Sequence, residues 1–279
     1  MIRSHQVNVK SVALHYDDLD TIYREVWGDH IHHGYWKNGS ETPTEACLQL
    51  IEFLAEKLHL KAGTRLIDVG CGYGATARYL AKKFNCSVQG LTISAAQFNY
   101  ASSLNEKKSG VELQLCDWMT NQIVAQSADV VYSIESSEHM PDFDKFFSEA
   151  ARVLKSRGKI AIFAWLESDS YKVWMKKYLL QPLCDEARMQ LWTRADYLNE
   201  LGINGFSKVK YYEISDQVKK TWTICIRRSI WKFIVDRKFR NYLFSTQSLN
   251  REFAKTIFRI RMAFATRSMS YGLFVAEKN

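Results

Sequence analysis

The stretch from Thr64 to Leu80, Thr-Arg-Leu-Ile-Asp-Val-Gly-Cys-Gly-Tyr-Gly-Ala-Thr-Ala-Arg-Tyr-Leu, constrains the fold of this chain more than any other. Its first half has the apolar run of a short buried strand, and its second half returns to apolar residues at helical spacing. Gly70, Gly72 and Gly74 join the two halves. Glycine lets the backbone take conformations barred to other residues and approach a ligand closely. The stretch therefore predicts a strand, a tight turn and a helix whose N-terminus can bind a carboxylate or phosphate.

Asp68 stands two residues before the first glycine, where its carboxylate can accept a hydrogen bond from a ligand ammonium. The pattern Asp-x-Gly-x-Gly-x-Gly resembles the first motif of class I S-adenosylmethionine (SAM)-dependent methyltransferases. The run Gly70-x-Gly72-x-x-Ala75 also fits the looser dinucleotide fingerprint, which is followed about 20 residues later by an acid for the ribose hydroxyls. No acid occurs between Asp68 and Glu106, which counts against a dinucleotide and also departs from the commonest methyltransferase pattern. The loop alone leaves open SAM, a dinucleotide and a purely structural turn.

Strand and helix patterns alternate around this loop. Thr42-Pro43-Thr44-Glu45 combines a capping box with proline at the first helical position, and predicts a helix that runs to about His59. After the loop we expect strands at 87–91, 111–116, 128–133 and 159–165, and helices at 94–104 and 143–154. Strands separated by helices of this length imply right-handed crossovers and a parallel sheet covered on both faces.

Beyond Trp165 the patterns become longer and mostly helical. We expect helices at 172–191 and 194–201, the second ended by Gly202, then a strand at 206–214, two or three more helices and a last strand at 271–276. The predicted fold is α/β, with a Rossmann-like, seven-stranded, mostly parallel sheet and helices on both faces. An N-terminal helical cap (1–60) precedes the core (61–166), and residues 167–279 supply a helical lid insertion and the closing strands.

Composition limits the class of protein. A chain of 279 residues with 47% hydrophobic residues and three prolines suits one compact domain with a lid. Its six cysteines form no C-x-x-C pair, which indicates reduced and mostly buried thiols. The N-terminus lacks the apolar run of a signal peptide, and no stretch approaches the length needed to cross a bilayer. We therefore expect a cytoplasmic protein.

The net charge of +8 is concentrated in residues 219–267, which carry 13 Lys or Arg against two acids. Eight aromatic residues are interleaved with these cations, namely Trp222, Trp231, Phe233, Tyr242, Phe244, Phe253, Phe258 and Phe264. The favoured interpretation is a solvated helical surface whose aromatic residues fill the core. Peripheral contact with a membrane is the second interpretation. Binding of nucleic acid is the least favoured.

Ligands of a parallel α/β sheet bind at the carboxyl edge of its strands, so the informative residues should follow strands. Thr92 and Ser94 follow the second predicted strand, and Asp117 and Trp118 follow the third. Glu135-Ser-Ser-Glu-His-Met140 follows the fourth. We expect these side chains to meet at one edge of the sheet.

With these positions included, the chain resembles one branch of the class I methyltransferases, the gamma-tocopherol methyltransferase-like group, which is related to sterol methyltransferases and cyclopropane fatty acid synthases. The matching blocks are His15-Tyr16-Asp17, Trp27-Gly28-Asp29-His30-Ile31-His32-His33-Gly34, Asp68-Val-Gly-Cys-Gly-Tyr-Gly74, Gly90-Leu-Thr-Ile-Ser94-x-x-Gln97 and Glu135-Ser-Ser-Glu-His-Met-Pro-Asp142. In this branch the Gly-x-Thr-x-Ser-x-x-Gln block stands where other methyltransferases carry the ribose-binding acid. The resemblance covers most of the first 165 residues and fades after about Leu166.

The resemblance implies that the core binds SAM and releases S-adenosylhomocysteine (SAH). It implies that Tyr16 and the aromatic cap around Trp36 close over the methionine end. The remaining cofactor-binding residues that we expect are Asp68, Gly70, Gly72 and Gly74 at the amino-acid portion, Thr92 and Gln97 on the ribose side, Asp117 and Trp118 at the adenine, and Ser133. Asp117 with Trp118 could instead be an ordinary strand end with a buried indole.

Methyl transfer from a sulfonium depends mainly on aligning the nucleophile, the methyl carbon and the sulfur in a dry pocket. A base helps only where the nucleophile loses a proton, and His139 suits that role because imidazole titrates near neutral pH. Glu138 or Glu135 could orient His139 or replace it, and the resemblance implies that Glu135 and His139 face the methyl group. The alternative is that His139 only packs at the start of the next helix.

Three histidines in one short block raise the question of a metal site. His30, His32 and His33 stand beside Asp29, but two adjacent histidines cannot easily point at one ion, so no metal site is predicted. We expect His32, His33 and Trp165 to contact the substrate instead. Ordinary packing is the alternative for these side chains.

The predicted function is a SAM-dependent methyltransferase that methylates an O, N or C atom of a lipophilic small molecule, such as a phenol, quinol, isoprenoid or alkaloid. An aromatic content of 13%, concentrated in the cap and lid, motivates the apolar substrate. One alternative is a cyclopropane or methyl-branching enzyme that acts on fatty acyl phospholipids. An alternative of another class is a nucleic-acid-binding protein that uses residues 219–267.

Overall fold

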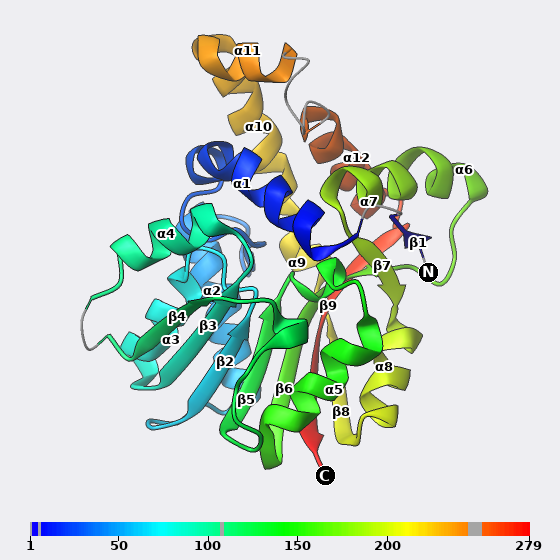
Figure 1. The fold of residues 1–279 in the computed structure, drawn as a ribbon. Helices are drawn as coiled ribbons and strands as arrows, with labels where there is room; N and C mark the ends of the chain where they lie inside the picture. Colours follow the sequence, from blue (N-terminus) through cyan, green and yellow to red (C-terminus); the bar gives the residue numbers. More distant parts are fainter. Residues whose placement is uncertain (1, 5–6, 107–108, 245–252) are drawn as a thin grey trace.

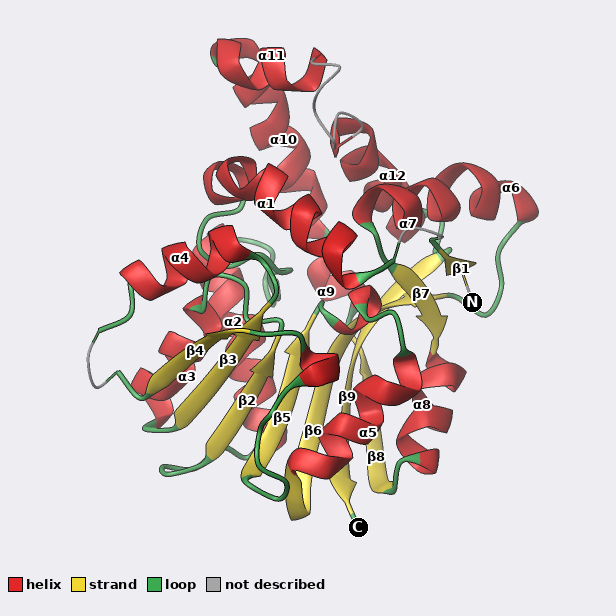
Figure 2. Cartoon of the chain, viewed as in Figure 1, coloured by secondary structure: helices red, strands yellow, loops and turns green. Residues whose placement is uncertain are grey.

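The computed structural model describes residues 2–4, 7–106, 109–244 and 253–279, and it shows an α/β protein built on one sheet (Figures 1 and 2). The strands of this sheet are β1 (Ile2–Arg3), β2 (Arg65–Val69), β3 (Ser87–Thr92), β4 (Val111–Leu115), β5 (Ala128–Ile134), β6 (Leu154–Glu167), β7 (Gln190–Thr193), β8 (Phe206–Glu213) and β9 (Met269–Lys278). Seven of them form the main sheet in the order β4-β3-β2-β5-β6-β9-β8. Strands β2 to β6 are parallel and β9 runs antiparallel to both of its neighbours. This arrangement confirms the predicted Rossmann-like sheet.

Helices cover both faces because successive residues of each central strand point to opposite sides. Leu66 joins the core cluster under α2 (Pro43–Leu58) and α3 (Ala75–Phe84), whereas its neighbour Ile67 joins the cluster under α5 (Phe143–Val153) and α8 (Arg194–Ile203). Helix α4 (Ala95–Ser103) connects β3 to β4. The predicted capping box of α2 is present, since the side chains of Thr42 and Glu45 bond to each other's backbone amides.

The structure corrects two predicted helix ends. The helix predicted at 172–191 is a helical run that comprises α6 (Val173–Met175), the π-helical turn η3 (Lys176–Leu180) and α7 (Gln181–Ala187). It ends at Arg188, whose φ of 51° turns the chain so that the next residues pair with β6 as β7. The helix predicted to stop at Gly202 continues to Ile203, and Gly205 (φ 78°) supplies the turn that follows.

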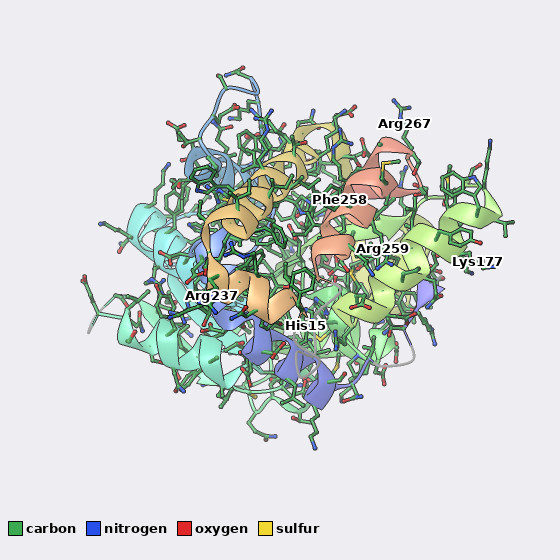
Figure 3. All side chains as sticks on the ribbon, turned by 90° about the horizontal axis from the view of Figure 1, so that it is seen from above. His15, Lys177, Arg237, Phe258, Arg259 and Arg267 are labelled. Carbon is green, nitrogen blue, oxygen red and sulfur yellow. The ribbon has the colours of Figure 1, made fainter. Side chains whose placement is uncertain are left out.

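Further helices lie above the carboxyl edge of the parallel strands (Figure 1). They are α1 (Val9–Val26), α9 (Ser215–Val218), α10 (Lys220–Val235), α11 (Arg237–Phe244) and α12 (Phe253–Ala265). Seen from above, α1, α6, α10, α11 and α12 cover the molecule (Figure 3). The basic segment is therefore helical where it is described, and its residues 245–252 lie outside the described part. Among the described helices, none has the length and apolar character needed to cross a bilayer.

Candidate active site

The glycine turn after β2 forms one wall of a crevice at the carboxyl edge of the sheet. Gly70 (φ 80°) and Gly72 (φ 53°) both line it. A Cβ atom on Gly70 would lie 2.4 Å from Cβ of Ser136, whereas a Cβ atom on Gly72 would meet nothing within 4 Å. Gly70 is thus required for close packing, and Gly72 leaves open space for a ligand. Gly74 is the N-cap of α3 and packs near Leu113 rather than lining the crevice.

Asp68 lies at the narrower end of this crevice, which spans about 340 Å³ and is partly open to solvent. Its side chain is buried, and its Oδ2 atom makes no close hydrogen bond among the described residues, although the Tyr132 hydroxyl lies near enough to lower the pKa of the carboxyl. Burial raises the pKa of Asp68 to about 7. A buried carboxylate oxygen without a partner is costly, and a ligand ammonium would remove that cost. The narrow end is therefore suited to a cationic group.

The wider part of the crevice spans about 750 Å³, part of it open to solvent, and shares Gly70, Gly72 and Ile31 with the narrow end. The four residues predicted here line it, namely Thr92, Gln97, Asp117 and Trp118. Thr92 Oγ1 donates a hydrogen bond to Gln97 Oε1 (2.9 Å), so the two side chains hold each other on the wall. Asp117 caps the 3₁₀ turn η1 (Trp118–Thr120) by accepting a hydrogen bond from the Met119 amide (2.9 Å). The crevice is continuous, and it suits an elongated ligand with a cationic end.

Besides Gly74, two more predicted cofactor residues lie away from the crevice wall. Ser133 Oγ is 2.7 Å from Ser136 Oγ, which in turn donates a hydrogen bond to the Val69 carbonyl, so Ser133 supports the glycine turn from behind. The indole N–H of Trp36 donates to Thr221 Oγ1 (3.2 Å). Its ring also lies beneath the Lys220 ammonium, 4.5 Å from it. These contacts attach the segment before α2 to α10 instead of placing Trp36 over the crevice.

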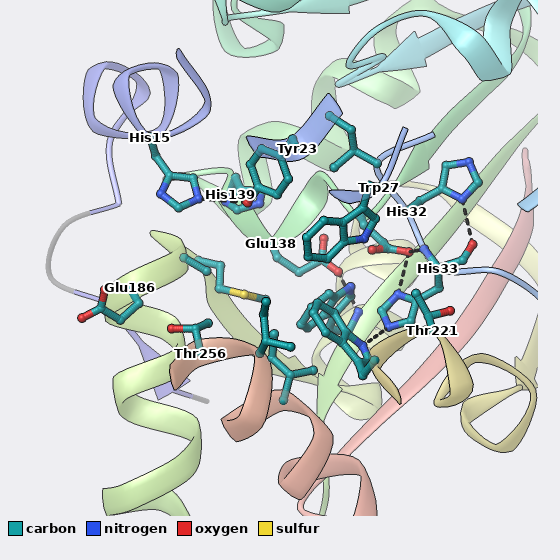
Figure 4. Close-up of a pocket in the computed structure, with 18 of the residues that line it drawn as sticks. His15, Tyr23, Trp27, His32, His33, Glu138, His139, Glu186, Thr221 and Thr256 are labelled. Atoms are coloured by element: carbon teal, nitrogen blue, oxygen red, sulfur yellow. Dashed lines mark hydrogen bonds and ion pairs between the residues drawn. The ribbon is translucent and has the colours of Figure 1, made fainter. Parts of the chain in front are cut away.

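A second cavity, which spans about 830 Å³ with its opening to solvent, adjoins the crevice beneath the upper helices (Figure 4). Its lining is mostly aromatic and aliphatic, and it comprises His15, Tyr16, Tyr23, Trp27, Ile31, His32, His33, Glu135, Glu138, His139, Trp165, Glu186, Ala187, Met189, Thr221, Trp222, Thr256, Ile257 and Ile260. Tyr16, Ile31, Glu135 and His139 line this cavity and the wider part of the crevice as well. Two ligands, one in each space, would meet at these four side chains.

Tyr16 and His139 form a hydrogen-bonded pair at this junction. The hydroxyl of Tyr16 is 2.9 Å from Nε2 of His139, and Nδ1 of His139 is 3.0 Å from the carbonyl oxygen of Arg188. A carbonyl only accepts, so Nδ1 carries the proton and Nε2 accepts from Tyr16. Desolvation lowers the pKa of His139, although the Arg188 carbonyl and the charge of Glu135 oppose this shift. Desolvation also raises the pKa of Tyr16 well above its usual value. The pair is therefore a neutral imidazole that accepts from a protonated phenol.

Glu135 is held by several donors at once. Its Oε1 accepts from the backbone amide of His33 (2.8 Å), from His33 Nδ1 (2.9 Å) and from the hydroxyl of Tyr271 (2.7 Å). Desolvation favours the neutral acid, but the adjacent His33 imidazole and the hydrogen bonds from His33 outweigh it and hold the pKa of Glu135 below its usual value. Its backbone has a φ of 56°, a conformation that residues with a side chain rarely adopt. Glu135 therefore presents a fixed negative charge at the junction.

Glu138 has a different environment although it is only three residues away. Its Oε1 accepts from the amide of Trp165 (2.6 Å) and its Oε2 from the hydroxyl of Ser137 (3.1 Å). Burial raises the pKa of Glu138 to about 8, with the charge of Glu135 contributing. The bond to Trp165 fastens the loop after β5 to β6, and the bond to Ser137 lies within that loop, so Glu138 lines the cavity mainly as an anchor.

The three predicted substrate residues all line the second cavity. Nε2 of His33 accepts from the indole N–H of Trp222 (2.6 Å), so both ring nitrogens of His33 are used within the protein. His32 also borders the narrow end of the crevice, where the Thr76 hydroxyl lies 3.3 Å from its Nε2. The indole nitrogen of Trp165 has no partner among the described residues.

Several residues at the junction were not predicted. Tyr271 comes from β9, far from Glu135 in the chain, and no pattern in the sequence links the two. The partner of His139 is a backbone carbonyl, which carries no signature in the residue type. Trp222 was assigned to the core of the basic segment, and only the packing of α10 shows that it lines a cavity.

Comparisons with known proteins identify the family of the chain. The family model described as mycolic acid cyclopropane synthetase matches residues 3–185. The chloroplastic tocopherol O-methyltransferase of Arabidopsis thaliana is 30% identical over 249 residues, which cover 81% of this chain and 71% of that protein. The 2-methyl-6-phytyl-1,4-hydroquinone methyltransferase of Synechocystis is 29% identical over 293 residues, which cover 96% of this chain and 87% of that protein.

A search of solved structures finds the same fold. A mycolic acid cyclopropane synthase in complex with SAH and CTAB has a TM-score of 0.86 at 21% identity, and the match covers 99% of each chain. A putative sarcosine dimethylglycine methyltransferase from Galdieria sulphuraria has a TM-score of 0.81 at 23% identity and covers 94% of this chain and 99% of that chain. At these identities the likeness concerns the fold.

Proposed function

The chain belongs to the mycolic acid cyclopropane synthetase family and is a SAM-dependent methyltransferase, and we propose that it methylates an O, N or C atom of a lipophilic small molecule bound in the second cavity. The observation that carries the proposal is that the crevice and the apolar cavity meet at Tyr16, Glu135 and His139. A methyl donor in the crevice and an acceptor in the cavity would therefore meet beside these side chains and Ile31.

The residues that line the crevice match the chemical groups of SAM. Asp68 Oδ2 lacks a partner and suits the ammonium of the methionine portion. The open space at Gly72 and the N-terminus of α3 suit the carboxylate. Thr92 with Gln97 would hold the ribose side, and Asp117 with Trp118 the adenine. When bound, SAM supplies an electrophilic methyl group that the acceptor atom takes in an in-line displacement.

Tyr16 and His139 provide a route for a proton when the acceptor is a hydroxyl or a protonated amine. The Tyr16 hydroxyl gives its proton to Nε2 of His139 and receives the acceptor's proton in exchange. The Arg188 carbonyl stabilises the imidazolium that forms, because Nδ1 already donates to it. Glu135 adds a negative charge that complements both the imidazolium and the positive charge at the donor side. Glu138 is a positioning residue in this scheme, as its two oxygens fix the loop that carries His139.

The shape and lining of the second cavity support an apolar acceptor. Trp27, Trp165 and Trp222 contribute indole rings to its wall, and Ile257 and Ile260 of α12 contribute aliphatic side chains. Relatives of the chain are named for tocopherol, for a phytyl hydroquinone and for a sterol. We therefore favour a phenol or quinol with an isoprenoid substituent, with His32, His33 and Trp165 among the residues that contact it.

The division expected from the sequence, with a cap at 1–60, a core at 61–166 and a lid at 167–279, belongs to this proposal. Helix α1 brings Tyr16 over the junction, and α10 and α12 wall the acceptor cavity. The six cysteines form no disulfide in the described part of the chain, which is compatible with the reducing cytoplasm. Peripheral contact of the basic segment with a membrane belongs to this proposal, and nucleic acid is not favoured.

Donor labelled with deuterium in its methyl group tests the proposal. The purified protein is incubated with this donor and a panel of phenols, quinols, isoprenoids, amines and unsaturated phospholipids, and the products are analysed by mass spectrometry. A product that keeps all three deuterium atoms identifies methyl transfer, whereas a cyclopropane keeps two because the ring closes with loss of one. Absence of labelled product from every member of the panel, with a folded protein that binds the donor, would contradict the proposal.

A further inference from the structure

The outer surface of the upper helices differs from the rest of the described surface. It exposes the side chains of Trp174, Tyr178, Trp231, Phe233, Phe244 and Phe258, and these are all of the strongly exposed aromatic side chains among the described residues. We call the outer surface of residues 172–178, 227–244 and 255–262 the lid face. It combines α6 and η3 with α10, α11 and α12, so segments from three parts of the chain contribute to it.

The tip of α10 is the most apolar part of the lid face. Five of the six side chains from Ile230 to Val235 are exposed, including Trp231 at 65% and Ile234 at 64%. Phe244 of α11 is 75% exposed, and its ring lies 6.2 Å from that of Phe233. A helical turn that is apolar around most of its circumference is poorly suited to water. This tip is therefore suited to burial against an apolar partner.

The same helices carry most of the excess positive charge. Residues 220–244 contain seven Lys or Arg and one acid, residues 172–180 contain three Lys and no acid, and α12 contains three Lys or Arg and no acid. That one acid, Asp236, pairs with Lys232 (3.0 Å), as does Glu25 of α1. Seen from above, Lys177, Arg237, Phe258, Arg259 and Arg267 all belong to this side of the molecule (Figure 3). Cations thus surround the exposed apolar side chains.

The combination of charge and apolar exposure discriminates between partners. The cores of protein interfaces are depleted of charged residues, and a second copy of the chain would bring like charges together. Single-stranded nucleic acid stacks on aromatic rings, but Val173, Ile230, Ile234, Val235 and Met262 offer no ring. An anionic membrane surface accommodates both kinds of side chain, because aliphatic groups enter the acyl boundary, aromatic rings occupy the headgroup level and cations meet the lipid phosphates.

We propose that the lid face docks on the surface of an anionic lipid membrane. The helices that form it also wall the acceptor cavity from within. On α12, Ile257 and Ile260 are buried and line the cavity, whereas Phe258 and Met262 are exposed on the outer side. Trp222 of α10 lines the cavity eight residues before the exposed Ile230. Docking places the cavity directly behind the membrane-facing helices, and delivery of a lipophilic acceptor from the bilayer to that cavity rests on the proposed function.

Sedimentation with lipid vesicles tests the apolar contribution. The full-length protein is mixed with vesicles of phosphatidylcholine, or of phosphatidylcholine with phosphatidylglycerol, and the bound fraction is measured in the pellet. We expect the protein to pellet with the mixed vesicles and much less with phosphatidylcholine alone. The double variant Trp231→Glu with Ile234→Glu should bind the mixed vesicles at least about tenfold more weakly than the wild type. The matched control is Val124→Glu, an exposed apolar site on a loop before β5, which should bind like the wild type.

Charge reversal tests the electrostatic contribution. Arg237→Glu with Lys238→Glu should reduce binding to the anionic vesicles about tenfold or more and leave the weak binding to phosphatidylcholine unchanged. The matched control is Lys82→Glu on α3, an exposed cation away from the lid face. Circular dichroism and donor binding verify that each variant is folded.

Three outcomes would overturn the inference. They are equal sedimentation of wild type and lid-face variants, failure of the wild type to bind either vesicle, and binding of RNA or self-association in place of vesicle binding. Methyl transfer to an acceptor dissolved in detergent is measured on the same samples. Transfer without vesicle binding refutes membrane docking alone, and vesicle binding without any transfer refutes the proposed function alone.

Discussion

The protonation state of Asp68 predicts how donor binding depends on pH. Burial raises the pKa of this carboxyl to about 7 in the free protein against the opposing effect of the Tyr132 hydroxyl, and its Oδ2 makes no close hydrogen bond with the described residues. The bound ammonium favours the ionised form, so binding is coupled to loss of a proton below pH 7. The affinity contributed by the charge is therefore present above the free-state pKa and lost as the pH falls through it.

The magnitude follows from the two ionised fractions. With a pKa of about 7, roughly a tenth of Asp68 is ionised at pH 6 and nearly all of it at pH 8, so the dissociation constant for SAM should be about tenfold larger at pH 6. The variant Asp68→Asn should bind about 10 to 100 times more weakly at pH 8, because it loses a charge-assisted hydrogen bond. Its affinity should also change little between these two pH values.

Calorimetric titration with SAM at pH 6, 7 and 8 measures both effects. The matched control is Asp29→Asn, an exposed carboxylate that lines the same narrow end of the crevice. This control should retain the pH dependence of the wild type. A wild-type affinity that does not change with pH, or an Asp68→Asn variant with the wild-type profile, would refute the role assigned to Asp68.

Two further predictions concern the junction and the glycine turn. Tyr16→Phe should lower kcat for a hydroxyl acceptor by about 10²-fold or more with little change in donor binding. Adding His139→Asn should lower kcat little further, because the two side chains act as one unit. Additive losses of kcat in steady-state kinetics would contradict proton transfer through this pair. Gly70→Ala should destabilise the fold by about 2–4 kcal/mol in urea unfolding, since its Cβ would lie 2.4 Å from that of Ser136 at a φ of 80°. Gly39→Ala, at a φ of 77° with nothing within 4 Å, should cost only about 1 kcal/mol, and equal losses at both sites would argue against the packing role.

Local chemistry made much of the core predictable from the sequence. The run of strands and helices from Arg65 to Glu167 follows the hydrophobic periodicities, and the cap of α2 follows from Thr42 and Glu45. The predicted helix at 172–191 failed at its end because the reversal at Arg188 depends on a positive φ at a residue that is not glycine. Pairing of β7 with β6 then depends on tertiary contact, which periodicity does not report.

The sequence predicted many of the residues of the site, but not the hydrogen bonds that join them to residues far away in the chain. Glu135 and His139 were singled out because they follow a strand, yet the bond from Glu135 to Tyr271 joins residues 136 positions apart. Trp36 was expected over the cofactor because it stands in an aromatic block, but Thr221 of α10 holds its indole. Such long-range partners are set by how the upper helices pack, and a single sequence contains no local signal for that packing.

The central claim is that the turn at Gly70 and Gly72, with Asp68 beneath it, holds the amino-acid end of SAM beside Tyr16 and His139. A crystal structure of the protein with SAH tests it most directly. The account predicts the ligand amino group within hydrogen-bond distance of Asp68 Oδ2 and the ligand sulfur facing the junction of the two cavities. An empty crevice at saturating ligand, or SAH bound elsewhere on the protein, would contradict it.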